Sequence, residues 1–529
     1  MTTMTRLAGG AALTALLCAM SSAVYAQGTT GAVRGRITDE AGAPIPGATV
    51  TVKHAPTGST TTQVTGVEGF FSARGLRVGG PYSVTANASG YAGGAATLTS
   101  IGVGDGASVN VSLMAEGSQV EELVITASTS KAATTGPSMS FSEEDINSLP
   151  SISRDLKDVA RLDPFATIDP NNSDALSFAG TNTRFNQLTV DGVRQNDDFG
   201  LNNNGYPTQR SPISLDAIGA VSISSAPYSV INNGFTGGQI NAVTKSGTNT
   251  LSGSAFYEKT GRDYQGDTIR GAPAGAEFSE KTWGVTLGGP ILKDRLFLFL
   301  AYEKFKGTLG LDEGPFDLGV TSKIPRITSA SAETFRQATR SVYGYDPGSF
   351  VQGVFPLSDE KYLAKIDWNM TDDHRLAFTY QKTLGNSLNG ATSNPTNNGN
   401  SITQPRLGLE TNQYDKIELL ETYTAQLNSD WTESLSTELR LSHKITDTTQ
   451  NPLGGLSIGE VTVGVADLPG VAAGAGAPQI RFGADLNRHD NYLHVELDTA
   501  EAIARYRLGP HNFMVGLRTE KDDIFNVFV

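Results

Sequence analysis

Cysteine is nearly absent from this chain of 529 residues, which holds a single one, Cys18. One cysteine excludes a disulfide framework, a cysteine-based zinc site and an iron–sulfur cluster. Charged residues are also sparse, at 18% of the chain, and the formal net charge is -14. An acidic chain has no general affinity for nucleic acid, so we expect no nucleic-acid partner.

Long apolar runs are missing beyond residue 26, so we expect no transmembrane helix. Residues 1–26 read as a signal peptide, with Arg6 in its basic part, an apolar stretch from Leu7 to Met20, and Val24-Tyr25-Ala26 at the cleavage site. Cys18 lies inside this peptide, and the large residue before it disfavours a lipoprotein signal. An exported chain without disulfides or a helical anchor fits either a secreted soluble protein or an outer-membrane β-barrel.

Glycine, by contrast, is abundant, and in residues 27–117 it separates short runs rich in valine and threonine. We expect strands there at residues 33–38, 48–52, 69–71 and 82–86, which predicts a small β-sandwich. The spacing G-x-I-x-D-x-x-G-x-P-I-P-G-A-x-V, from Gly35 to Val50, resembles the carboxypeptidase regulatory-like domain. The resemblance does not imply peptidase activity, because in that family the domain is an appendage of the catalytic one.

Residues 118–130 change character. An acidic pair is followed by a β-branched run in the segment Glu121, Glu122, Leu123, Val124, Ile125, Thr126 and Ala127. An exposed extended segment of this kind can add a strand to the sheet edge of a partner. Nothing in its pattern predicts a sheet of its own, and the residues alone favour an interdomain linker.

Residues 131–248 mix helix and strand signals. Ser142 is placed to cap a helix with an acidic first turn, and Ser153 to cap a second helix that buries Leu156, Val159 and Ala160 and ends at Pro164. A strand at residues 187–193 runs into an Asp-Gly turn, and residues 217–223 form another. These signals predict an α/β unit.

The order of these units, with N-Q-L-T-V-D-G-V at residues 186–193 and G-G-Q-I-N-A-V-T-K-S-G-T-N at residues 237–249, resembles TonB-dependent outer-membrane receptors. The stretch from Gly180 to Asn186, where many plugs carry an Arg-Gly pair, suits the Oar-like group. The resemblance implies a TonB box at residues 121–127 and a plug domain at residues 131–248. It also implies plug-motif roles for Arg184, Asn186, Asp191, Gly192, Gly237, Gly238, Asn241, Lys245 and Gly247.

Residues 249–529 alternate between apolar and polar side chains, as membrane-spanning β-strands do. Apolar runs that we expect to face lipid include Trp283–Leu287, Tyr362–Trp368, Leu376–Tyr380, Leu493–Leu497 and Phe513–Leu517. Short turns at residues 290–294, 371–374 and 509–512 contrast with long polar stretches at 305–358, 384–413 and 447–488, the asymmetry of an outer-membrane barrel. Aromatic residues near the strand ends predict interfacial girdles: Trp283, Tyr302, Tyr362, Trp368, Tyr380 and Trp431.

A large soluble β-sandwich would show the same alternation. The preceding plug and the run from Gly284 to Glu303, which resembles the first barrel strands of Oar-like receptors, favour the barrel. We therefore expect a mainly β fold: a sandwich, an α/β plug and an antiparallel transmembrane β-barrel. Nine or ten strands are visible, against about 22 in the barrel that the resemblance implies. We therefore expect this chain to be the N-terminal fragment of a longer receptor.

Catalytic signatures are missing: the sequence has no nucleophile elbow, phosphate-binding loop or zinc motif, so we expect no enzyme activity, no metal and no cofactor. His494 and Glu496 share a strand face, which we interpret as a polar pair inside the barrel. Asn196, Asp197 and Asp198 could form a ligand-facing apex of the plug. A solvated loop is the alternative.

These observations lead to a hypothesis of ligand uptake through the cell outer membrane, driven through TonB by the proton-motive force of the inner membrane. The partners would be TonB, outer-membrane lipid and an extracellular ligand of unidentified class. A second hypothesis is a structural or adhesive outer-membrane protein whose transport is vestigial. A secreted peptidase-associated protein is a third, against which the absent zinc motif and the barrel alternation both argue.

Overall fold

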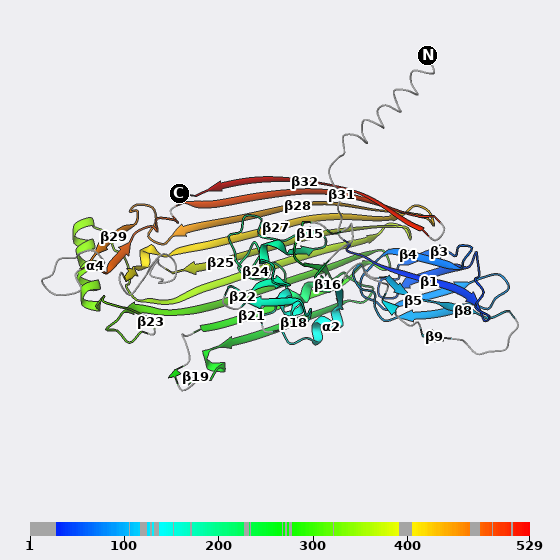
Figure 1. Cartoon of the computed structure of the whole chain (residues 1–529), viewed down its shortest axis with the longest axis horizontal. Coiled ribbons are helices and arrows are strands. Elements are labelled where there is room, and N and C mark those ends of the chain that lie inside the picture. The colour runs from blue at the N-terminus through cyan, green and yellow to red at the C-terminus, as the bar shows by residue number, and fades with distance from the viewer. Residues whose placement is uncertain are drawn as a thin grey trace, which may run out of the picture.

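The computed structural model describes residues 28–528, apart from residues 105, 117–123, 127–129, 132–136, 152, 170–171, 227–231, 233, 267, 270–271, 274–277, 321, 391–404, 466–476, 489 and 509–510. The predicted signal peptide and Glu121, Glu122, Leu123 and Ala127 lie outside the described residues. Three units follow one another: an N-terminal sandwich, a plug and a large antiparallel sheet (Figure 1). No helix in the described part is long and apolar enough to cross a bilayer.

The N-terminal unit is a sandwich of two sheets, as predicted. One sheet holds β1 (Gly31–Asp39), β4 (Phe70–Leu76), β7 (Gly106–Ser108), β8 (Val111–Leu113) and β10 (Ser130–Lys131). The other runs in the order β3 (Thr60–Val64), β2 (Thr49–His54), β5 (Tyr82–Asn87), β6 (Gly94–Leu98) and β9 (Val124–Thr126). Alternate residues of each strand point inward, so Val33, Val50, Phe71 and Val84 meet in one apolar core.

The segment after this unit is more than a linker. β9 pairs in parallel with β6, and β10 pairs with β7 in antiparallel fashion. Both strands therefore extend the sheets of the N-terminal sandwich. The sequence pattern did not predict these pairings, because strand pairing between residues 95–97 and 124–126 depends on contacts that are distant in sequence.

The plug is built on a mixed sheet in the order β11 (Ser138–Ser142), β16 (Ile218–Ser224), β17 (Gln239–Thr244), β14 (Gln187–Val190) and β15 (Val193–Arg194). A hairpin of β12 (Ala166–Asp169) and β13 (Ala175–Phe178) and short 3-10 turns η1 (Thr183–Phe185) and η2 (Leu215–Ala217) complete it. Its core joins both helices to the sheet and reaches Phe299, Ala301 and Leu363 of the large sheet.

One of the two predicted helix caps is confirmed. Ser142 caps α2 (Glu143–Ser148) through a capping box with Asp145. The prediction of Ser153 as the second cap is wrong, because the Asp155 side chain accepts the Lys157 N–H and caps α3 (Leu156–Ala160). Ser153 instead donates its hydroxyl to Asp158. Leu156, Val159 and Ala160 are buried, as predicted, but the helix ends before Pro164.

The large sheet is a meander of long antiparallel strands. Its order is β18 (Ser252–Gly261), β21 (Phe278–Leu292), β22 (Leu296–Pro315), β24 (Gln352–Asn369), β25 (His374–Asn389), β27 (Tyr414–Asp430), β28 (Leu435–Pro452), β31 (Asn491–Leu508) and β32 (His511–Val527). β23 (Ser322–Ile324) adds in parallel to β22. Small elements near β18 are η3 (Arg262–Tyr264), β19 (Thr268–Ile269) and β20 (Ala272–Pro273). The ten strands of this described sheet agree with the predicted number.

The outer face of this sheet, which points away from the plug, is apolar, and its inner face carries many polar side chains, as predicted for a membrane barrel. Trp283, Val285, Ile366 and Phe378 are exposed outward, whereas the Lys365 side chain is buried inside. One row of outward aromatic rings holds Trp283, Tyr302, Tyr362, Tyr380 and Tyr423, and a second row, near the short turns, holds Trp368, Trp431 and Tyr506. Between the rows the strands run about 20–27 Å, close to the height of a bilayer's apolar band.

The predicted orientation of β31 is wrong at its start. Leu493, Val495 and Leu497 are 4%, 1% and 1% exposed and face inward, while His494 and Glu496 lie on the outer wall. A strand alternates with period two, so the face that carries buried Glu501 is also the face of Leu497. This part of β31 lies beyond the aromatic row that includes Tyr423, on the side of the long loops. There His494 pairs with Asp447 at 2.6 Å and does not contact lipid. The prediction that His494 and Glu496 form a polar pair inside the barrel is therefore wrong.

The long loops are shorter than predicted, because the strands continue past the apolar band. They span residues 316–351, 390–413 and 453–490. Their described parts build a small subdomain of α4 (Ser329–Tyr343) and a sheet of β26 (Arg406–Gly408), β30 (Gln479–Phe482) and β29 (Val461–Gly464), with η4 (Glu410–Asn412) beside it. It has its own apolar core around Phe482. This subdomain and the N-terminal sandwich lie at opposite ends of the large sheet (Figure 1).

Candidate functional site

The plug lies on the inner face of the large sheet, called the wall below, and ion pairs and hydrogen bonds join the two at several places. We call the set of contacts between plug and wall the seat. At its centre is the tight turn between β14 and β15, where Asp191 and Gly192 have φ values of 47° and 78°. Such left-handed backbone favours glycine and, next best, asparagine or aspartate. The Asp-Gly pair predicted from sequence therefore forms this turn, and it aims the Asp191 side chain at the wall.

Asp191 links two plug strands to two wall strands. Its carboxylate accepts the Thr244 N–H at 2.9 Å and the Thr244 hydroxyl at 2.6 Å within the plug. On the wall, Thr379 donates its hydroxyl at 3.1 Å and the Lys365 ammonium lies 3.6 Å away. Lys365 also donates to the Thr244 carbonyl at 3.2 Å. All of these groups are buried, so removing the carboxylate would leave a buried cation without its charge partner.

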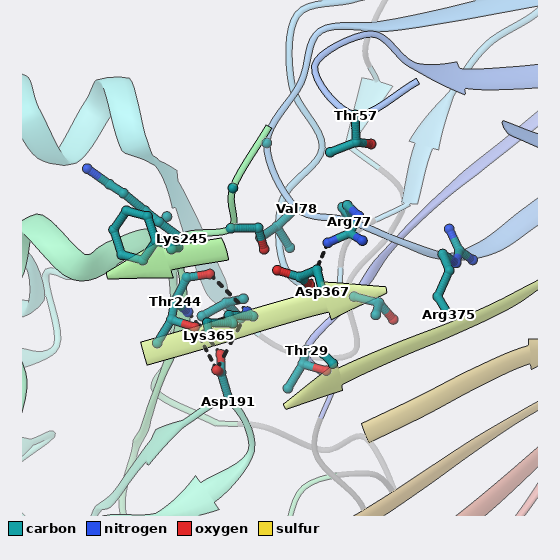
Figure 2. Close-up of a pocket in the computed structure, with 18 of the residues that line it drawn as sticks. Thr29, Thr57, Arg77, Val78, Asp191, Thr244, Lys245, Lys365, Asp367 and Arg375 are labelled. Carbon is teal, nitrogen blue, oxygen red and sulfur yellow. Dashed lines mark hydrogen bonds and ion pairs between the residues drawn. The ribbon is translucent and has the colours of Figure 1, made fainter. Parts of the chain in front are cut away.

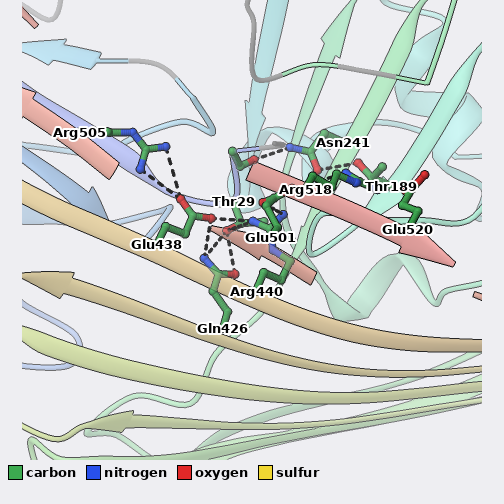
Figure 3. A network of polar contacts seen from close by, with 11 residues as sticks. Thr29, Thr189, Asn241, Gln426, Glu438, Arg440, Glu501, Arg505, Arg518 and Glu520 are labelled. Atoms are coloured by element: carbon green, nitrogen blue, oxygen red, sulfur yellow. Dashed lines mark hydrogen bonds and ion pairs between the residues drawn. The ribbon is translucent and has the colours of Figure 1, made fainter. Parts of the chain in front are cut away.

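Gly192 lies against Arg440 of the wall. A Cβ atom at position 192 would overlap the Arg440 guanidinium group. That guanidinium donates to Glu501 at 2.9 Å and to Glu438 at 2.7 Å, and both carboxylates are buried. Arg505 pairs with Glu438, and Arg518 pairs with Glu501 and with Glu520, so three arginines face three carboxylates. The cluster also reaches Thr29 and Gln426 (Figure 3).

The other glycines of the plug motif lie where backbones or rings approach closely. A Cβ atom at Gly237 would overlap the Asn186 side chain, and one at Gly238 would overlap the Phe178 ring. Asn186 joins β13 to the start of β17, because it donates to the Leu176 carbonyl at 2.7 Å and accepts the Gly238 N–H at 3.0 Å. Gly247 lies against the Leu298 carbonyl of the wall.

The remaining motif residues are spread around the plug. Asn241 accepts the Thr189 hydroxyl and donates to the Gly28 carbonyl at 2.6 Å. Lys245 pairs with Glu143 of α2 at 2.8 Å, and Arg184 donates to the Gly200 carbonyl at 2.7 Å. The motif residues therefore divide into those that seat the plug on the wall and those that hold its own loops.

The predicted apex residues are engaged in contacts within the loop and with the wall. Asn196 accepts the Leu188 N–H and donates to the Asn186 carbonyl, and Asp197 accepts the N–H groups of Phe199, Gly200 and Asn202. Asp198 pairs with Lys444 of β28 and with Arg194 at 3.0 Å. The loop lies toward the long-loop end of the wall, since Asn202 contacts Lys416 and Glu418 near the start of β27.

Further charged pairs complete the seat. Arg154 pairs with Asp216 at 2.7 Å and with Glu258 of β18 at 2.8 Å. Arg210 pairs with Asp359 of β24 at 2.7 Å and stacks on the Phe305 ring.

Inside the plug, Tyr206 is buried and donates its hydroxyl to the Asp155 carboxylate. Burial, and then the negative charge of Asp155, raise the pKa of Tyr206 well above its ordinary value.

A cavity of about 240 Å³ lies where the N-terminal sandwich, the plug and the wall meet (Figure 2). Lys365, Arg375 and Asp367 line it from the wall, Asp191 from the plug and Arg77 from the sandwich. Arg77 donates to Asp367 at 2.6 Å and to Asn369 at 3.0 Å, which ties the sandwich to the short-turn end of the wall. The Asn249 N–H donates to the Pro56 carbonyl as a second tie.

His54 lies at the edge of this cavity and is buried. Its ring contacts the Tyr82 ring at a centroid distance of 4.7 Å, and its Nδ1 lies 2.7 Å from the Thr57 hydroxyl. Burial, and then the nearby Arg77 and Arg375 cations, lower the pKa of His54 to about 3. The ring is therefore neutral throughout the physiological pH range.

Sequence reasoning missed the wall side of the seat, above all Lys365, Arg440 and Lys444, and the docking residue Arg77. One signal was available: a lysine or arginine at an inward position of a membrane strand needs a buried partner. Which partner it has depends on how the plug sits, and local patterns do not contain that information.

Three family models match the chain: the carboxypeptidase regulatory-like domain at residues 32–114, the TonB-dependent receptor plug domain at residues 130–239, and an outer membrane beta barrel domain at residues 243–313. The chain has the domains of a TonB-dependent receptor. The barrel domain indicates that the protein lies in the outer membrane, as predicted. The TonB-dependent transporter Oar of Myxococcus xanthus is 28% identical over 242 residues, which are 44% of this chain and 21% of Oar.

Solved structures of outer-membrane proteins align with part of this chain. The outer membrane transporter YddB from Escherichia coli aligns with a TM-score of 0.52 and 11% identity over 73% of this chain and 48% of that one. The siderophore receptor PirA from Acinetobacter baumannii aligns with a TM-score of 0.49 and 16% identity over 74% of this chain and 48% of that one. The chain described here spans less than half the length of each of these three proteins.

Proposed function

We propose that this receptor takes up an extracellular ligand across the outer membrane, and that TonB drives uptake with the proton-motive force of the inner membrane. The observation that carries the proposal is a plug joined to the wall through buried ion pairs and hydrogen bonds. The matched plug and barrel domains support the same proposal.

A polar seat suits a plug that has to move. Asp191 with Lys365, Asp198 with Lys444 and Arg210 with Asp359 join plug to wall. Water can replace such contacts when the plug shifts, whereas separating a continuous apolar interface would expose its whole area to water. An apolar contact through Phe299, Ala301 and Leu363 accompanies these pairs.

The partner proposed for this movement is periplasmic TonB, and its binding segment is residues 121–127. Val124, Ile125 and Thr126 are extended in β9, the conformation that strand addition needs. A ladder of backbone hydrogen bonds suits traction, because the bonds share the load along the segment.

The ligand would meet the plug from the long-loop end, at the apex loop that contains Asn196, Asp197 and Asp198. Because these three side chains hold the loop, the surface offered to a ligand includes the exposed side chains of Phe199 and Leu201. Nothing in this mechanism calls for a cofactor or a catalytic step, and we assign the receptor a transport role without enzyme activity.

The test is binding of the purified receptor, in detergent, to the periplasmic domain of TonB. Val124→Pro removes a backbone donor from the segment and should abolish capture while leaving insertion into the outer membrane unchanged. Capture equal to that of the unsubstituted receptor would refute the TonB role of this segment. Growth that depends on a supplied ligand but not on TonB would instead favour the structural or adhesive alternative.

A further inference from the structure

The middle of the proposed TonB segment is already a strand of the N-terminal sandwich. β9 pairs in parallel with β6, in the register Ala95 with Val124, Ala96 with Ile125 and Thr97 with Thr126. The sheet order is β3-β2-β5-β6-β9, so β9 is the terminal strand. Of the strands that the structure describes, β6 is the one that pairs with β9, and the other edge of β9 is open.

This open edge lacks the usual protection against strand addition. Val124, Ile125 and Thr126 are β-branched, and none of the three is a proline or a charged residue. Natural proteins commonly place lysine, proline or a bulge at an edge strand to prevent pairing with other chains. The opposite edge of the same sheet, β3, lies beside the wall, where Arg507 donates to the Val64 carbonyl at 3.5 Å. The two edges of this sheet are therefore not equivalent.

We propose that TonB adds its strand to the open edge of β9 while β9 stays paired with β6, so that the N-terminal sandwich is the docking platform. This inference rests on the proposed function, since the partner is the same. A segment held in an extended conformation loses less conformational entropy on binding than a free linker does. The platform therefore increases the affinity of a short segment without adding side-chain contacts.

The platform also determines where traction acts first. The sandwich is tied to the short-turn end of the wall by Arg77 with Asp367 and by the Asn249 N–H with the Pro56 carbonyl. These ties border the cavity between the sandwich, the plug and the wall. A pull on β9 would load the sandwich and these ties before it reaches the plug sheet.

The alternative is that β6 hides the segment and must release it before TonB can bind. A disulfide across β6 and β9 separates the two models. Neighbouring strands lie about 4.8 Å apart, within the Cα separation that a disulfide tolerates. The test receptor carries Thr97→Cys and Thr126→Cys, with Cys18→Ala to remove the other thiol. Ala95→Cys with Val124→Cys is the second pair, for use if the first receptor does not accumulate.

If the sandwich is the docking platform, the affinity of the oxidised receptor for the periplasmic domain of TonB should be within twofold of its affinity after reduction. A loss of tenfold or more on oxidation, restored by reduction, would overturn the proposal and support release. Failure of both pairs to form a disulfide would also overturn it, because β9 would not lie on β6.

The matched control is Thr51→Cys with Thr62→Cys across β2 and β3, which are register partners in the same sheet. Oxidation of this control should leave binding unchanged, which shows that a disulfide in the sandwich does not itself impair TonB binding. If even the unsubstituted receptor fails to bind, the proposed function fails together with the platform. Binding that is lost in the oxidised β6–β9 pair alone removes the platform and leaves the proposed function standing.

Discussion

The N-terminal sandwich and the plug seat are held together in opposite ways. The sandwich closes over an apolar core in which Val33, Val50 and Val84 have no exposed surface. The seat joins plug to wall through buried charges such as Asp191 with Lys365 and Asp198 with Lys444. An apolar core loses its stabilisation as soon as it opens, whereas separated charges regain hydration. Under the proposed function, the sandwich would stay folded while the contacts between plug and wall break and form again.

The largest effect on stability is expected when volume is removed from the apolar core of the sandwich. Phe71→Ala should cost about 3–5 kcal/mol and unfold the sandwich while the plug remains on the wall. Limited proteolysis, followed by mapping of the fragments, measures this. Phe70→Ala is the matched control, because Phe70 is 53% exposed on the same strand, and it should leave the sandwich resistant. Equal proteolysis of both variants would contradict the apolar core as the source of stability.

The corresponding change in the seat is Asp191→Ala. It leaves the Lys365 ammonium buried without its carboxylate and should weaken the seat by about 3 kcal/mol. Hydrogen exchange should then increase in β14 and β17, with no change in β2 or β5. Glu144→Ala, an exposed carboxylate of α2, serves as the control and should alter neither region. Protection of β14 equal to that of the unsubstituted receptor would show that Asp191 does not secure the plug.

The sandwich should also respond to pH through His54. The folded state keeps the ring neutral to about pH 3, but an unfolded histidine takes up a proton near pH 6.5. The unfolded state therefore binds more protons as the pH falls, and the sandwich should lose about 2 kcal/mol between pH 7.5 and pH 5. Thermal melting of the receptor and of His54→Gln at both pH values measures the difference. Parallel pH dependence in the two proteins would rule out His54 as the cause.

The smallest expected effect concerns the tie between the sandwich and the wall. Arg77→Ala removes one cation beside the buried Asp367 carboxylate. Because that carboxylate borders the cavity and keeps Lys365 nearby, the change should cost only about 1 kcal/mol of docking without unfolding either unit. Chemical cross-linking between the sandwich and the wall should decrease. The control is Arg36→Ala. Arg36 donates to the Glu68 carbonyl within the sandwich, so this change should leave cross-linking to the wall unchanged. A decrease in both variants would point to a nonspecific loss of charge.

Much of the fold follows from short-range patterns. Strands β1, β2, β4 and β5 of the sandwich, the Ser142 cap, the Asp191-Gly192 turn and the outward faces of β21, β24 and β25 were predicted correctly, since each depends on residues within a few positions. Predictions failed where the pattern alone was ambiguous. Ser153 and Asp155 can both cap a helix, and only Asp155 reaches the first-turn N–H of Lys157. The apolar residues of β31 were assigned to lipid because a core and a bilayer select the same side chains.

The candidate site was predictable on one side only. The plug motif contains Asp191 and Gly192, and a turn of this type restricts which residues fit. Their partners Lys365 and Arg440 lie on wall strands far along the chain, and their choice depends on how the plug packs. The same holds for β9, because two strands of the other sheet, β7 and β8, lie in sequence between β9 and its neighbour β6.

By itself, the sequence determined the order of the units, the period-two alternation of the membrane strands and the turns that need aspartate or glycine. These features depend on local backbone geometry and on whether a side chain prefers water or an apolar surrounding. The tertiary structure decided which face of β31 looks inward, which cation meets Asp191 and which strand holds β9. Those outcomes depend on contacts between residues far apart in the chain, where several pairings satisfy the local rules and packing selects one.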